Sequence, residues 1–308
     1  MVRYLVRRLL SALIVLLGVT LIVFALLRLT PGDPAELVLG DTAEITPQDI
    51  ARVRARLGLD KSLVTQYGIF IWDLIHGDLG TSVYSREPVA QVIAGKMGNT
   101  LLLTGSGLVL SVLIAVPVGV VSAAKPYTLF DSASMALALS GTAIPSFWLG
   151  LMLILLFGVK LKWLPPSGAG TWRHLILPAL TLGLGRAALL TRLIRASLLE
   201  AVSQDYVRTA RAKGLGERAI LFRHALRNAL IPVVTVLGLQ VAFLLSGAVL
   251  TETVFAWPGL GRAMVRAVLE RDYPVVQGIA LLISASVVLT NLLIDLCYGL
   301  LNPTIRRE

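Results

Sequence analysis

Residues 205–232 read DYVRTARAKGLGERAILFRHALRNALIP, a basic and alanine-rich stretch between two long apolar runs. Gly214 and Gly216 divide it into two pieces of helical composition. Glycine accommodates the left-handed conformation that commonly ends a helix, so Gly214 predicts the end of the first piece. The stretch is too basic to lie within a bilayer, and we expect two short helices outside it.

The first piece has the composition of a docking helix. Ser203 or Asp205 is expected to cap its first amide groups. Its small side chains, Ala210 and Ala212, would let another protein approach the backbone closely. Four residues at helical spacing share one face: Tyr206, Thr209, Ala210 and Lys213.

The apolar runs decide the class of protein. Of the 308 residues, 56% are hydrophobic and 15% are charged. Several apolar runs have about twenty residues, which is enough to cross a bilayer as a helix. We therefore predict an all-α, polytopic membrane protein. Six transmembrane helices are expected, at about residues 9–27, 99–123, 132–159, 174–198, 228–250 and 277–300.

The chain carries a formal charge of +10. In a soluble protein this excess would suggest a nucleic-acid partner, but here most basic residues flank apolar runs, where positive charge sets membrane orientation. The distribution places both termini and residues 205–232 in the cytoplasm, and we expect no nucleic-acid partner. The alternative that the basic residues of 205–232 only set orientation stays open at this point.

Residues 29–98 have mixed charge and frequent glycine and proline. Two short helices are expected, the first from Thr46 to about Gly58 and the second from about Ser62 to His76. Both are too polar or too short to span, so this part is predicted to be an extracytoplasmic helical segment.

Two motifs of the opening stretch resemble the coupling loop of ATP-binding-cassette (ABC) importer permeases of the dipeptide, oligopeptide and nickel branch. They are DYVRTARAKG at 205–214 and HALRNALIP at 224–232. GDLGTS at 77–82 and TETVFAWPGLG at 251–261 resemble further elements of that branch. The broader importer pattern opens with Glu-Ala-Ala, where this chain has Arg208, Thr209 and Ala210, so no ion pair of that glutamate is carried over.

The resemblance implies a permease subunit with the type I ABC importer (MetI-like) fold and a helical insertion between its first two spans. Its parts would be the cytoplasmic N-terminus with the first span (1–28), the insertion (29–98), a five-helix core (99–300) with a cytoplasmic coupling loop (200–228), and a cytoplasmic tail (301–308). The protein would lie, surrounded by lipid, in a prokaryotic cytoplasmic (inner) membrane.

The same resemblance implies partners. They are a second homologous permease that forms a heterodimer with this chain, two cytoplasmic ATPase subunits and an extracytoplasmic substrate-binding protein. ATP and Mg would be bound by the ATPases, and this chain would bind no cofactor. The residues implied to couple the ATPases to the spans are Asp205, Tyr206, Val207, Arg208, Thr209, Ala210, Arg211, Ala212, Lys213 and Gly214.

Six residues are expected along the pathway or at its outer gate: Arg186, Gln240, Glu252, Phe255, Pro258 and Gly259. Arg186 lies deep in the fourth span, where a cation is costly unless it faces protein, water or a carboxylate. It either lines the pathway or pairs with Asp295 or with another subunit. Arg192 and Arg195 are expected to reach the membrane interface, and Phe255, Trp257 and Leu260 to dip into it.

Motifs for catalysis or nucleotide binding are absent from the sequence. It has no phosphate-binding glycine loop, no zinc-protease motif and no serine nucleophile elbow, and its one cysteine, Cys297, forms no cluster. We predict a transport subunit with no catalytic or metal-binding residues. The rival class is an ion-gradient-driven secondary transporter, which usually shows internal repeats and buried carboxylates; only Asp295 is a candidate here.

The solute is selected mainly by the binding protein in such systems. Peptides (di- or oligopeptides) are the favoured solute because they are common in this branch. Nickel complexes, glutathione and oligosaccharides are the alternatives.

Overall fold

The computed structural model describes residues 2–29, 46–56 and 60–301. The predicted cytoplasmic tail lies outside these residues from 302 onward, as does the side chain of Asp295. The chain forms two compact units, one made of residues 1–98 with 262–308 and one of residues 99–261. In the part that is described, helices dominate and the strand-like contact is an isolated bridge between Thr81 and Pro88.

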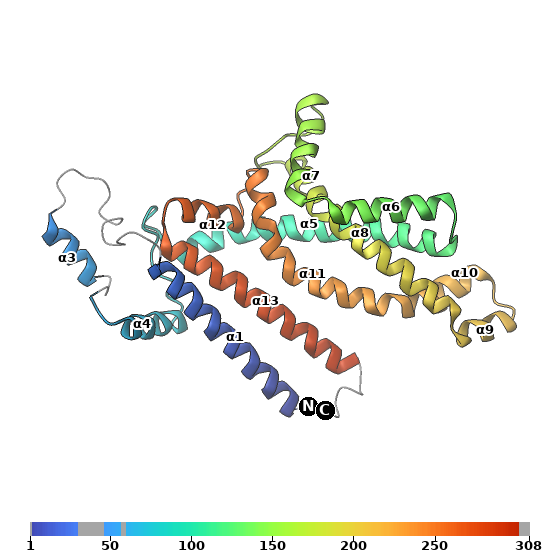
Figure 1. The fold of residues 1–308 in the computed structure, drawn as a ribbon, viewed down its shortest axis with the longest axis horizontal. Coiled ribbons are helices and arrows are strands. Elements are labelled where there is room, and N and C mark those ends of the chain that lie inside the picture. The colour runs from blue at the N-terminus through green and yellow to red at the C-terminus, as the bar shows by residue number, and fades with distance from the viewer. Residues whose placement is uncertain (1, 30–45, 57–59, 302–308) are drawn as a thin grey trace. The chain divides into compact units, whose positions relative to one another are not determined.

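The first unit is built around two long apolar helices. Here α1 (Val2–Leu29) and α13 (Tyr273–Leu301) run side by side (Figure 1). The shorter α4 (Leu63–Ile75) packs against α1. The remaining helices of this unit are α3 (Pro47–Arg56), the first turns of α5 (Val89–Ala124) and most of α12 (Leu260–Leu269).

The second unit is organised around α8 (Arg173–Ser203). This helix packs against α11 (Leu226–Val254), α6 (Leu129–Ala143) and α7 (Ser146–Leu153) (Figure 1). The unit also contains the rest of α5 and the short elements η1 (Ile154–Lys160), α9 (Asp205–Ala212), α10 (Glu217–Ala219) and η2 (Ile220–Ala225).

Small residues allow α5 and α8 to approach closely. A Cβ at Gly119 would stand 2.9 Å from Cβ of Ile194 and 3.0 Å from the carbonyl oxygen of Thr191. A Cβ at Gly183 would likewise stand 2.9 Å from the carbonyl oxygen of Gly107. Glycine at such points is typical of membrane helices, where association depends on close packing rather than on the hydrophobic effect.

The predicted spans are confirmed in type, with one correction. Within the described residues, five helices are long and apolar enough to cross a membrane, or six if the bent pair formed by α6 and the helix Ser146–Lys160 is one span. That pair bends by 106°, so the third predicted span is not one straight helix. The break lies at Pro145, because a residue before proline, here Ile144, is pushed to extended backbone.

Two span boundaries also differ from those predicted. Helix α5 begins at Val89 rather than at Asn99, and α13 begins at Tyr273 rather than at Gln277. In the additional turns, Val89, Ile93 and Val275 are buried within the first unit. A Cβ at Gly278 would stand 2.6 Å from a methyl group of Val89. Tertiary packing therefore extends both helices beyond their apolar runs.

The GDLGTS loop at 77–82 encloses a buried carboxylate. Asp272 accepts hydrogen bonds from the Ser82 hydroxyl and from the amides of Val83 and Tyr84. Gly77 and Gly80 have φ of 78° and 79°, a conformation that disfavours other residues. The motif thus has a structural role: it turns the chain around Asp272.

Candidate functional site

The predicted coupling residues, Asp205 to Gly214, are called the coupling segment below; they begin with α9, which follows the last turn of α8. Its N-cap is Gln204 and no side chain caps it, so the predicted capping by Ser203 or Asp205 is wrong. Ser203 instead donates its hydroxyl hydrogen to the Glu200 carbonyl within α8. The first helical piece nevertheless starts at Asp205, because the extended backbone of Gln204 breaks α8 from α9.

Helix α9 ends in a Schellman motif. The amide of Gly214 donates to the carbonyl of Arg211 at 2.9 Å, and the amide of Leu215 donates to the carbonyl of Ala210 at 3.3 Å. Gly214 has φ of 77°, as expected from its position in the sequence. The second piece then begins at Glu217 and continues through η2 into α11 without a break.

The inner face of α9 corrects the predicted docking face. Val207 and Ala210 are buried against Ile220, the first residue of η2. Ala210 is therefore small because it packs against the next segment of its own chain, and it does not present space to a partner. Ala212 is exposed. The sequence periodicity identified a helix but assigned Ala210 to the wrong surface.

The outer face of α9 is polar and exposed. The Arg211 guanidinium donates two hydrogen bonds to the Glu217 carboxylate, at 2.8 and 3.2 Å, and this contact raises the pKa of Arg211. Arg208 lies 3.6 Å from Asp205 on the same surface. The exposed residues of the segment are Asp205, Tyr206, Arg208, Thr209, Arg211, Ala212, Lys213 and Gly214.

Packing connects the coupling segment to the long helices. On α8, Leu198 and Ala201 belong to the same buried cluster as Ala225 at the end of η2 and Ala229 on α11. Because such a cluster is close-packed, it transmits displacement between the elements that share it. Helix α9 contacts α8 and η2, and η2 continues into α11, so α9 lies against both elements that lead into this cluster (Figure 1).

Asp131 and Arg195 form a contact that the sequence did not predict. Arg195 was expected to reach the membrane interface, but its guanidinium donates two hydrogen bonds to the carboxylate of Asp131 on α6. Asp131 also accepts from the amide of Tyr127 at 2.9 Å. The sequence did contain a signal for the position of Asp131. Thr128, three residues earlier, is typical of a helix N-cap followed by an acidic residue in the first turn.

Glu252 lies buried near the end of α11. Its carboxylate accepts a hydrogen bond of 2.6 Å from the hydroxyl of Thr100, whose oxygen accepts from the amide of Leu260 at 2.8 Å. Gly259 packs against this carboxylate, and any Cβ there would overlap it. The motif TETVFAWPGLG therefore folds over its own glutamate and ties it to the start of the second unit.

The apolar residues of the same motif face inward. Phe255, Trp257 and Leu260 are all buried within the second unit, which corrects the expectation that they dip into the membrane interface. The Trp257 ring N–H donates to the carbonyl of Asn99 at 2.9 Å, and the Asn99 side chain donates to the carbonyl of Pro258 at 3.0 Å. These two hydrogen bonds attach the turn at Trp257 and Pro258 to Asn99 on α5.

Gln240 and Arg186 are predicted pathway residues whose polar groups have no partner among the described residues. Gln240 is buried, and neither its amide oxygen nor its amide nitrogen has a hydrogen-bond partner in the described part of the chain. Arg186 is half-buried on α8 and makes no ion pair with a described residue. Buried polar groups are normally paired, so both side chains have unused hydrogen-bonding capacity.

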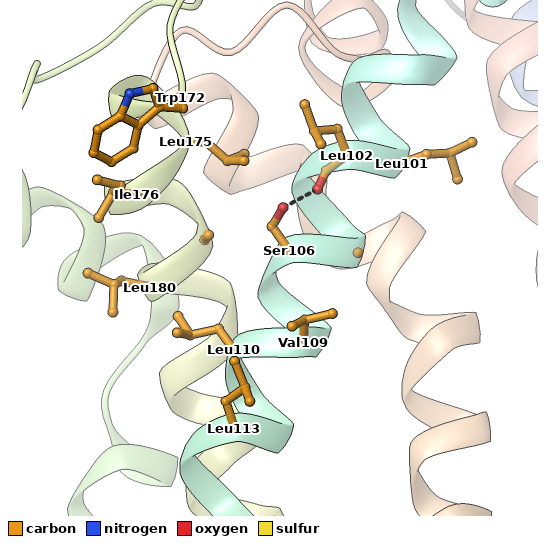
Figure 2. Close-up of a pocket in the computed structure, with 12 residues that line it drawn as sticks. Leu101, Leu102, Ser106, Val109, Leu110, Leu113, Trp172, Leu175, Ile176 and Leu180 are labelled. Carbon is orange, nitrogen blue, oxygen red and sulfur yellow. Dashed lines mark hydrogen bonds between the residues drawn. The ribbon is translucent and has the colours of Figure 1, made fainter.

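An open groove runs between α5 and α8 (Figure 2). Its volume is about 650 Å³, and none of the predicted pathway residues line it. The hydroxyl of Ser106 is bonded to the carbonyl of Leu102, and the other lining residues are apolar except for the ring N–H of Trp172, so the groove offers a charged solute no charged partner. Among the described residues, no group of three His, Cys, Asp or Glu side chains is placed to hold a metal ion.

Comparison with known proteins agrees with this geometry. Residues 115–307 match the family described as binding-protein-dependent transport system inner membrane component. Residues 1–104 match the N-terminal region of the membrane component of such systems. The chain belongs to this family of ABC importer permeases. The family consists of membrane transport subunits rather than enzymes, and its bacterial members are polytopic permeases.

Relatives of this ABC importer permease match it over almost their full length. It is 46% identical to the glutathione transport system permease protein GsiC of Escherichia coli O6:H1 over 306 residues, 99% of both chains. It is 47% identical to GsiC of Pectobacterium atrosepticum and 45% identical to GsiC of Escherichia coli K12, also over 306 residues and 99% of both chains. These similarities place the permease in the dipeptide, oligopeptide and nickel branch.

Proposed function

We propose that this permease imports short peptides of the glutathione class, driven by separate ATPase subunits that grip the coupling segment at Asp205–Gly214. The observation that carries the proposal is the construction of α9. It is a short helix with an exposed polar face and an inner face packed onto Ile220 at the start of η2, which continues into α11. An ATPase that binds such a helix can move it as a rigid unit together with the residues packed against it.

The solute is proposed from the names of the relatives and from two side chains. Glutathione is a tripeptide with two carboxylates, and Arg186 is a half-buried cation that can receive one of them. The unpaired amide of Gln240 is buried in this conformation, and we propose that it bonds a peptide group when movement of α11 exposes it. The apolar groove between α5 and α8 suits neither group, because burying an unpaired charge is costly.

The roles proposed for the other pathway residues are indirect. Glu252, Phe255 and Gly259 are buried in this conformation, so they position the outer gate rather than contact the solute. Pro258 turns the chain above them. Motion of α8 and α11 would shift this end of α11, because Glu252 lies on that helix.

The assembly proposed for this permease has both chain termini and the coupling segment in the cytoplasm. A second homologous permease encloses the pathway with it, two ATPases bind on the cytoplasmic side, and a substrate-binding protein delivers the solute from outside. The basic residues beside the spans favour this orientation.

The test is transport by the assembled complex in proteoliposomes. Labelled glutathione, supplied with the binding protein on the outer side, is expected to enter only when ATP is present on the ATPase side. Unlabelled glutathione, dipeptide, nickel complex and oligosaccharide are used as competitors. If unlabelled glutathione alone reduces uptake of the label, the solute assignment is supported. If only another class of compound reduces it, that class becomes the proposed solute.

A second experiment distinguishes this proposal from the alternative that the protein is a secondary transporter. The permease is reconstituted without ATPase subunits under a proton or sodium gradient. No uptake is expected. Gradient-driven uptake in this arm would overturn the coupling mechanism, whatever the solute.

A further inference from the structure

The helix α4 has an unusual distribution of apolar side chains. Its inner face packs on α1, where the Tyr67 and Phe70 rings contact Phe24 with ring centroids 5.3 and 6.0 Å apart. Its outer face is also apolar: Val64, Trp72 and Ile75 are 82%, 65% and 74% exposed. A helix at a protein–water boundary normally carries polar residues on its outer face.

The neighbouring helix α3 provides the contrast. Its sequence PQDIARVRAR exposes Gln48, Arg52 and Arg54, as expected for a helix that faces water. The sequence of α4, LVTQYGIFIWDLI, contains one charged residue, Asp73. Gln66 is buried and donates to the carbonyl of Lys61, so it does not make the outer face polar.

Contacts with α1 determine the depth of α4. The apolar run of α1 continues past Ala25 to Leu27, the last residue before Arg28. The Tyr67 hydroxyl lies 2.9 Å from the hydroxyl of Thr20 and donates to the carbonyl of Leu17 at 3.4 Å. At 1.5 Å per residue, Thr20 lies roughly 10 Å inside the end of that run. Helix α4 is thus attached to α1 at a level within its apolar run.

The length and flanks of α4 determine its orientation. A helix of 13 residues is about 20 Å long, too short for a hydrocarbon core of roughly 30 Å. Polar residues flank both ends, at 60–62 and at 76–78. Both ends of α4 therefore lie in the same polar interface of the membrane, and the helix axis runs parallel to the bilayer rather than across it.

We infer that α4 is an interfacial helix whose outer face, formed by Val64, Ile69, Trp72 and Ile75, inserts among the lipid chains of the leaflet at the C-terminal end of α1. This face continues the apolar surface of α1, on which the side chains of Ile14, Leu21 and Ile22 are also exposed. Tryptophan is enriched at this level of a membrane because its ring is apolar and its N–H is polar. The helix anchors the first span in the leaflet.

Site-directed spin labelling of the full permease in nanodiscs tests this inference. Cysteine is introduced at Val64, Trp72 or Ile75 in a Cys297→Ser background, and collision rates with oxygen and with a water-soluble nickel chelate are measured. Oxygen concentrates in lipid, so the collision rate with oxygen is expected to exceed the collision rate with the nickel chelate several-fold at all three positions. Ile14→Cys on α1 is the lipid control and Ala55→Cys on α3 is the water control.

Each other outcome overturns the inference. Nickel accessibility equal to that at position 55 would show that the face is in water. Low accessibility to both reagents would show that a protein surface covers it. Quenching by brominated lipids provides a second readout, since Trp72→Phe should lower the quenched fraction of tryptophan fluorescence. These measurements need no solute and no ATPase, so they are independent of the proposed function.

Discussion

The carboxylate of Asp131 accepts hydrogen bonds of 2.5 and 2.7 Å from the guanidinium of Arg195 and so joins the start of α6 to α8. The two side chains are 3% and 21% exposed. Paired and doubly bonded charges are stable at such a site, whereas either one alone is not. This contact holds α6 against the helix that leads into the coupling segment.

Loss of this ion pair is expected to destabilise the permease. Asp131→Asn should lower the free energy of unfolding by about 2–3 kcal/mol, because Arg195 loses a charged acceptor. The measurement is thermal unfolding in detergent. In a double-mutant cycle with Arg195→Gln, the two changes should be strongly non-additive. Additive effects would show that the pair contributes little.

The two alanines of α9 are expected to behave differently. Ala210→Leu overfills the contact with Val207 and Ile220 and should destabilise the segment by about 1–3 kcal/mol, seen as faster amide exchange in α9 of the isolated permease. Ala212→Leu should leave exchange unchanged, because Ala212 is exposed, and should instead weaken binding of the ATPase. Equal exchange in both variants would contradict the assigned faces.

Arg186 is expected to act on transport rather than on assembly. Arg186→Leu should reduce solute uptake by the complex at least tenfold, the equivalent of about 1.4 kcal/mol, because a carboxylate loses its cationic partner. ATPase binding, measured by co-purification, should be unchanged. Arg192→Leu is the control, since Arg192 is exposed on the same helix. Unchanged uptake by Arg186→Leu would remove this residue from the pathway.

Glycines of α5 are expected to differ according to their surroundings. Gly119→Ala should cost about 1–3 kcal/mol of stability, because its Cβ would meet the Thr191 carbonyl and Ile194 Cβ, neither of which can turn aside. Gly105→Ala has open space and should be neutral or stabilising by up to about 1 kcal/mol. Thermal unfolding of both variants makes the comparison. Similar midpoints would mean that α5 and α8 can separate at little cost.

Much of the fold could be predicted because membrane spans have a strong local signal. Twenty apolar residues must form a helix within a bilayer, whatever their neighbours. The division of the coupling segment was also predictable, since Gly214 adopts a backbone conformation that its sequence position suggested. The third span was predicted as one helix, whereas the structure bends it by 106° at Pro145, and the size of that bend depends on packing.

The sequence by itself determined the class, the helical spans and the membership of an importer permease family, because those properties depend on composition and on short motifs. The tertiary structure alone decided which side of each helix faces protein. It turned Ala210 inward, paired Arg195 with Asp131 and enclosed Glu252 and Asp272 in their loops. The physical reason is that a hydrogen bond or an interhelical contact joins residues far apart in sequence, and spacing along one helix carries no information about the partner.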